Sequence, residues 1–208
     1  GATIGVGAIA DLTGGLTLVD AGGLATFGAL GQGTTGDITV TDSSAGVTFG
    51  GAVTATTLTL TDTTAAADIT FQGDLVATTL TSTATSAYDV QFDENVTITN
   101  DVDFGAIGTL TIGTADDDVA TFTGGVDATS ATGTVTLAGA INTVGTAMDF
   151  GAVTLDDGTT FDTGNAAAGT IVVGDITTAT NEVSFDSGST PGATIGVGAI
   201  ADLTGGLT

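Results

Sequence analysis

Phenylalanine recurs in this sequence at nearly constant intervals, and most recurrences share one local pattern. Phe27, Phe49, Phe71 and Phe92 follow one another at almost equal spacings, and the last three close the triplets VTF, ITF and VQF. Alternation of apolar and polar residues with β-branched side chains predicts a β-strand with its phenylalanine directed inward. A unit of this length cannot bury a core alone, so its copies must stack on one another.

A second strand signal follows the phenylalanine at a fixed distance. Residues 55–59 and 77–81 both read ATTLT and lie at the same place after Phe49 and Phe71. No stretch has the apolar period of a helix, so we expect an all-β chain. The repeat predicts a parallel β-solenoid (β-helix) with about nine coils per 191 residues if each coil has about 21 residues, or ten if each has about 19. The alternative is an antiparallel β-sandwich.

The two ends of the chain have the same sequence. Residues 1–17 read GATIGVGAIADLTGGLT, and residues 192–208 repeat all 17 positions at an offset of 191. Such identity predicts a tandem array in which residues 1–191 form one unit of solenoid coils and residues 192–208 begin the next identical unit. The alternative is a chain whose identical ends exchange strands between subunits.

The charged residues are all acidic. The chain has 24 aspartates and glutamates, no lysine, arginine, histidine or cysteine, and a formal charge of −24. A chain without cations cannot neutralise phosphates, so nucleic acids and anionic lipid surfaces are not expected partners. No apolar run approaches the roughly 20 residues of a membrane helix, and we expect no membrane insertion. Serine has no histidine or lysine to take its proton, and zinc sites lack imidazole and thiolate, which favours a non-enzymatic protein. Acid–base catalysis by two carboxylates, as in glycosidases, is the alternative.

Two short motifs resemble catalytic signatures. The segments FDTG (161–164) and FDSG (185–188) are similar to the aspartic-protease signature. They lie close together in the chain, however, whereas the two lobes of a pepsin-like enzyme contribute one aspartate each from distant segments. The same phase after a core phenylalanine is occupied by Asp93. We therefore interpret both motifs as products of the repeat.

Acidic residues recur just before the phenylalanines, where alternation turns them outward if the coils are in register. We expect such carboxylates to form a partial column at one corner, in which charges about 4.8 Å apart repel one another. Because the chain has no cation, either salt screening or a hard divalent ion must compensate, and calcium suits carboxylate and carbonyl oxygens. The candidate calcium ligands are Asp68, Asp89, Asp101, Asp116, Asp117, Asp118 and Glu182.

The segment VTFGGAVTATTLTLTDTTAAADITFQGDLVATTLT (47–81) resembles the degenerate β-solenoid repeats of large bacterial surface proteins of the filamentous-haemagglutinin and autotransporter-adhesin type. The resemblance implies a β-helix at an extracellular location or on a cell surface. Together with the tandem ends, it predicts a structural unit of a filament, sheath or surface coat that associates with copies of itself. The alternatives are the stalk of a cell-surface adhesin or, from outward threonines such as Thr57 and Thr59, an ice-binding solenoid.

Overall fold

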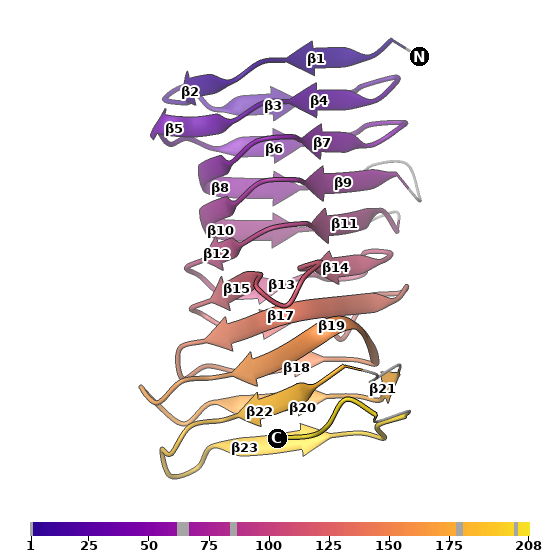
Figure 1. Cartoon of the computed structure of the whole chain (residues 1–208). Coiled ribbons are helices and arrows are strands. Elements are labelled where there is room, and N and C mark those ends of the chain that lie inside the picture. Colours follow the sequence, from indigo (N-terminus) through magenta and orange to yellow (C-terminus); the bar gives the residue numbers. More distant parts are fainter. Residues whose placement is uncertain (1, 62–66, 84–86, 178–180, 202–203) are drawn as a thin grey trace.

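A computed structural model describes residues 2–61, 67–83, 87–177, 181–201 and 204–208. In this part of the chain there is no helix, and the strands wind into a solenoid of stacked coils (Figure 1). The strands of neighbouring coils pair in parallel. The expectation of a parallel β-solenoid is therefore confirmed, and the β-sandwich alternative is wrong.

Each coil has three strand segments, which stack into three faces. Face A contains β1 (Ile4–Val6), β4 (Ala25–Phe27), β7 (Val47–Phe49), β9 (Asp68–Phe71), β11 (Asp89–Phe92), β14 (Leu110–Ile112) and β21 (Ile176–Thr177). Face B contains β2 (Ile9–Asp11), β5 (Leu30–Thr34), β12 (Val96–Ile98), β15 (Val119–Phe122) and β22 (Val183–Asp186). Face C contains β3 (Leu16–Leu18), β6 (Ile38–Val40), β13 (Val102–Asp103), β16 (Val126–Asp127), β18 (Met148–Phe150), β20 (Thr170–Val173) and β23 (Thr194–Val197).

Four longer strands bend around a corner, so each of them belongs to two faces. Strands β8 (Val53–Leu60) and β10 (Leu75–Ser82) belong to faces B and C, because their first halves pair with each other beside β12 and β5 and the second half of β8 pairs with β6. Strands β17 (Val135–Thr143) and β19 (Val153–Asp162) belong to faces A and B. Faces A and B and the first part of face C are thereby hydrogen-bonded as one 18-stranded sheet.

The core is a column of side chains inside the three faces. On face A, Phe27, Phe49, Phe71 and Phe92 lie in register on successive coils, with ring centroids 5.4, 4.7 and 5.2 Å apart. Their nearly parallel rings are offset neighbours at the favourable distance for aromatic pairs. The phenylalanine spacing of the sequence is therefore the length of one coil.

The phenylalanine rhythm changes after Phe92 because the later phenylalanines belong to other faces. In the face A column, Phe92 is followed by Ile112, and Phe104 comes after β13 at face C. Phe122 lies on face B opposite Ile98.

Coil length also varies in this later part of the chain. On face A, Leu110 pairs with Val135 one coil later, and Val135 pairs with Val153 one coil after that. The first of these coils is longer than both expected lengths, and the second is shorter than both. The corners between the strands therefore differ in length from coil to coil, and the register of β17 and β19 shifts where they turn a corner, between Leu137 and Gly139.

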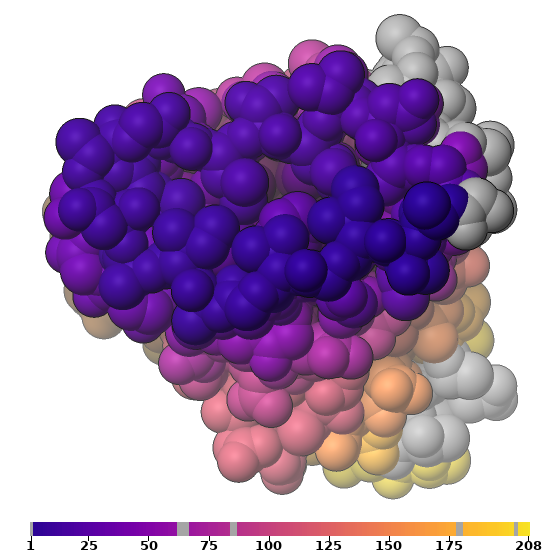
Figure 2. Space-filling view, turned by 90° about the horizontal axis from the view of Figure 1, so that it is seen from above, coloured from indigo at the N-terminus to yellow at the C-terminus, as the bar shows by residue number. Residues whose placement is uncertain are grey.

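The two ends of the solenoid are open strand edges. Seen from the N-terminal end, the indigo atoms of the first coil are uppermost, and purple atoms of later coils are visible between them (Figure 2). At the other end, the described residues of the segment 192–208 continue the winding: β23 pairs with β20, Ile200 bridges to Ile176 and Leu207 bridges to Val183. The segment that repeats the N-terminal sequence is thus an ordinary coil and not a separate linker.

Candidate functional site

The predicted calcium ligands are distributed over three corners of the solenoid, so the expected partial column includes only two of them. Asp68 and Asp89 lie in register at the start of β9 and β11 on face A. Asp101 directly precedes β13 on face C, and Glu182 directly precedes β22 on face B. The reason is that the phenylalanines that follow these acids in the sequence lie on different faces. Only Asp68 and Asp89 are adjacent members of a column.

Asp118 differs from the other candidates because its side chain is buried, with 7% of its surface exposed. It stands four positions before the inward Phe122, and an even offset along a strand places both side chains on the same face. Its Oδ2 accepts hydrogen bonds from the backbone N–H groups of Thr114 (2.7 Å) and Ala115 (2.9 Å). Asp118 therefore closes the turn before β15, while Asp116 and Asp117 in that turn are exposed.

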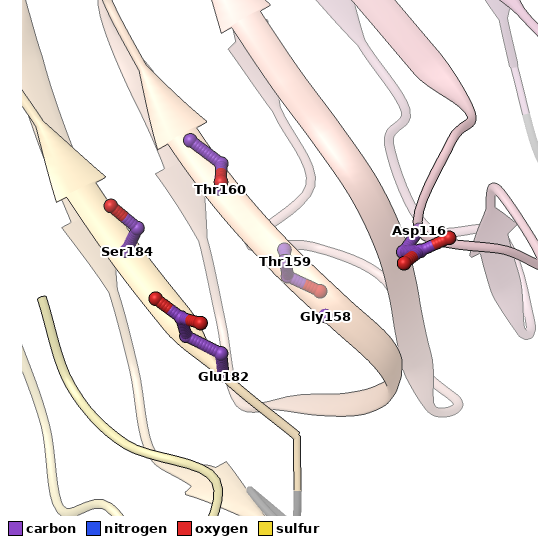
Figure 3. Close-up of a pocket in the computed structure, with 6 residues that line it drawn as sticks. All are labelled: Asp116, Gly158, Thr159, Thr160, Glu182 and Ser184. Carbon is purple, nitrogen blue, oxygen red and sulfur yellow. The ribbon is translucent and has the colours of Figure 1, made fainter.

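Asp116 and Glu182 line one surface groove of about 250 Å³. The two carboxylates lie on opposite sides of Gly158 and Thr159, and Thr160 and Ser184 lie on neighbouring strands beside them (Figure 3). Thr160 and Ser184 are register partners on β19 and β22. Residues from distant parts of the sequence thus meet on one face, and the groove is open to solvent.

Glycines at the corner before face B leave the space that forms this groove. A Cβ atom added to Gly158 would lie 3.9 Å from both Asp116 Cβ and the Glu182 carbonyl oxygen. One coil earlier, Gly139 adopts φ = +73°, and a Cβ atom there would lie 2.2 Å from the Asp118 carbonyl oxygen. A side chain at Gly139 therefore cannot fit, and one at Gly158 would project between the two carboxylates.

The side-chain polar atoms that line the groove are all oxygens. The two carboxylates and the hydroxyls of Thr160 and Ser184 are ligands of the type that hard cations such as calcium prefer, whereas the Thr159 hydroxyl is buried and donates to the carbonyl oxygens of Leu137 and Asp157. Within the described residues, no group of three or more acidic side chains is arranged to hold a metal ion. An ion in this groove would therefore depend on hydroxyl, carbonyl and water oxygens for most of its coordination. Within the groove, the hydroxyl of Ser184 has no histidine or lysine to take its proton, because both residue types are missing from the sequence.

The aspartic-protease-like motifs form turns. Asp162 and Asp186 are register partners on β19 and β22, so their separation in sequence is one coil. Each accepts a hydrogen bond from a backbone N–H two positions later, from Gly164 (2.6 Å) and Gly188 (2.7 Å). Both glycines have positive φ, which explains why DTG and DSG recur at this corner. The interpretation of these motifs as products of the repeat fits this geometry.

Sequence analysis missed a ladder of three aspartates on face C. Asp103, Asp127 and Asp149 are register partners on β13, β16 and β18. Partial burial, and next the charge of Asp127, raise the pKa of Asp149 above its ordinary value of 3.8. The coil-length spacing of these aspartates could have revealed the ladder, but only with the face of each strand known.

Among the described residues, no helix is long and apolar enough to cross a lipid bilayer.

Comparison with known proteins places the chain in no established group: no protein-family model matches it, and neither a curated protein nor a solved structure is significantly similar to it. The comparisons therefore show no family, and what the structure shows is the architecture, a parallel β-solenoid with repeat-like coils.

Proposed function

We propose that this chain is a non-enzymatic structural repeat unit of a long extracellular filament, sheath or surface coat. The observation that carries the proposal is that residues 192–208, which repeat residues 1–17, pair with the preceding coil as the last coil of the solenoid. A fold whose next unit begins as an ordinary coil can be extended by adding copies. The partners in this proposal are further copies of the same unit.

The composition also supports a material exposed outside the cell. A chain with no lysine or arginine offers no cleavage site to trypsin-like proteases. Phenylalanine and aliphatic columns run along the axis, and the backbone ladders between coils carry load in the same direction. The surface location itself comes from the resemblance of residues 47–81 to bacterial surface proteins, and it remains part of the proposal.

The test is the shape of a chain that contains two tandem units. A continuous solenoid lengthens by about 40–45 Å per added unit, because coils rise about 4.8 Å each, while its cross-section stays constant. Small-angle X-ray scattering measures both quantities. A matched control replaces the first coil of the second unit by a glycine–serine linker of equal length. If the parent chain scatters like this control, as two jointed beads, the proposal is wrong.

The second candidate is an adhesin stalk, which the resemblance of residues 47–81 favours. In that function the same rod holds a binding domain, encoded elsewhere in the chain, away from the cell. The sequence that flanks this segment in the complete protein distinguishes the two candidates. A filament protein continues with further units, whereas a stalk leads into a domain of different composition.

A further inference from the structure

The repeated sequence of residues 1–17 and 192–208 lies on different faces at the two ends of the solenoid. Ile4, in the first copy, belongs to β1 on face A and lies opposite Ala25. Its copy Ile195 belongs to β23 on face C and lies opposite Ile171. The same segment, IGV, thus lies in a strand in both places, one face apart.

The other strands of the repeated segment are displaced in the same sense. Ile9 lies on face B, and its copy Ile200 bridges to Ile176 on face A. Leu16 lies on face C, and its copy Leu207 bridges to β22 on face B. All three strand positions therefore move back by one face, which indicates a rotation of the whole coil and not a local register error.

The displacement follows from the number of coils in one unit. Nine register steps on face A lead from Ile4 to Ile200, through Ala25, Val47, Ile69, Val90, Leu110, Val135, Val153 and Ile176. Ile195, the copy of Ile4, lies on face C, one face before the chain returns to face A at Ile200 and completes the ninth coil. One unit, residues 1–191, therefore occupies eight and two-thirds coils.

We propose that successive units of the tandem array are each rotated by one face, about one third of a turn, around the solenoid axis. The inference rests on the proposed function, because it needs units joined end to end. It also identifies what covers the N-terminal edge: strands β20, β21 and β22 of the preceding unit pair with β1, β2 and β3, as they pair here with residues 194–197, 200 and 207. These contacts cover Ile4, Ile9 and Leu16, which are only partly buried in the described chain.

The rotation gives the filament a threefold screw. Each unit rises about 42 Å, and its orientation is restored after three units, or 26 coils, about 125 Å along the axis. A feature that a single unit has on one face, such as the groove of Asp116 and Glu182, then appears on each side of the filament in turn. Such a filament has no unique lateral face, so it bends equally in all directions and contacts its surroundings from every side.

Cysteine cross-linking in the chain of residues 1–208 tests the face on which the second unit begins. The rotated start places Gly196 beside Val172, with strand spacing of about 4.8 Å, within the roughly 4.4–6.8 Å range of Cα separations in disulfides. An unrotated start, with a shorter last coil, would place Gly196 beside Thr177. The chain has no cysteine of its own. We expect V172C/G196C to cross-link under mild oxidation and the matched pair T177C/G196C to remain mostly reduced; the reverse result overturns the inference.

Cryo-electron microscopy of a chain of many tandem units separates this inference from the proposed function. A continuous rod with a repeat of about 125 Å and a one-third turn every 42 Å supports both. A continuous rod whose full repeat equals one unit retains the structural function and overturns the rotation. Separate beads overturn both.

Discussion

At the scale of single residues, the aromatic column gives the largest expected effect. Phe71 is fully buried between Phe49 and Phe92, so replacement by alanine leaves a cavity that the fixed strand spacing prevents from closing. We expect F71A to lower the free energy of unfolding by about 3–5 kcal/mol. Circular dichroism and the fluorescence of Tyr88, the single tyrosine, follow the transition.

The matched control is F185A. Phe185 also stacks on a phenylalanine, Phe161, with centroids 5.1 Å apart, but it is only partly buried. Its loss therefore opens less cavity and should cost clearly less stability than the loss of Phe71. Equal effects of the two substitutions would contradict the assignment of Phe71 to a tightly packed interior.

Alternation along a strand predicts whether a side chain points into or out of the solenoid, but it does not tell on which face that strand lies. Alternation correctly predicts that Phe49 and Phe71 point inward and that Asp68 points outward. The same rule applied at an even offset would have placed Asp118 inside, where the structure has it. The groove residues Thr159, Thr160 and Ser184 could not be found, because nothing local in the sequence reports that residues 116, 158 and 182 share a corner.

At the scale of strands, Asp149, the last aspartate of the ladder of β13, β16 and β18, opposes folding at neutral pH because of its partial burial and the charge of Asp127. The raised pKa of Asp149 means that its charged form is disfavoured in the folded state, so stability is gained as the pH falls from neutral through this raised value toward 3.8. D149N should stabilise the protein at pH 7 by roughly 1 kcal/mol or less, since salt screens the charge of Asp127. Below pH 3.8 the variant and the parent should converge.

Thermal unfolding of D149N and the parent, measured from pH 3 to 8, checks this expectation. The control is D156N, which removes the same charge at an exposed position of β19 that has no aspartate as its register partner. A gain at pH 7 as large in D156N as in D149N would indicate a general effect of net charge. The ladder would then have no part in the pH dependence.

The elements themselves were predictable where the coil length was constant. Between Phe27 and Phe92 the sequence period equals the coil length, and the predicted strands lie where β7 to β11 are observed. After Phe92 the coil length varies because corners are shortened or extended, as where β17 and β19 bend between faces without a break. Corner length leaves no periodic signal, so the face of Phe104 could not be assigned from its VDF triplet.

At the scale of the whole molecule, the charge of −24 without a compensating cation makes stability depend on ions. If calcium binds in the groove, removing either carboxylate should weaken binding. With an extracellular-type dissociation constant of roughly 10⁻⁴–10⁻³ M, 10 mM calcium would add about 1.4–2.7 kcal/mol. We expect calcium to raise the midpoint of thermal unfolding of the parent chain, chelation to reverse it, and D116N and E182Q to lose most of this response.

Two controls separate specific binding from screening. D117N removes one charge from the same turn as Asp116, but Asp117 does not line the groove, so this variant should respond to calcium like the parent. Sodium chloride at matched ionic strength measures screening alone, which acts on all exposed carboxylates. Because a rotated array carries the groove on each side in turn, a specific calcium response would reinforce every side of the filament. If sodium chloride reproduces the calcium response and all three variants behave alike, the acids act only through screening and the hypothesis that calcium binds in the groove is wrong.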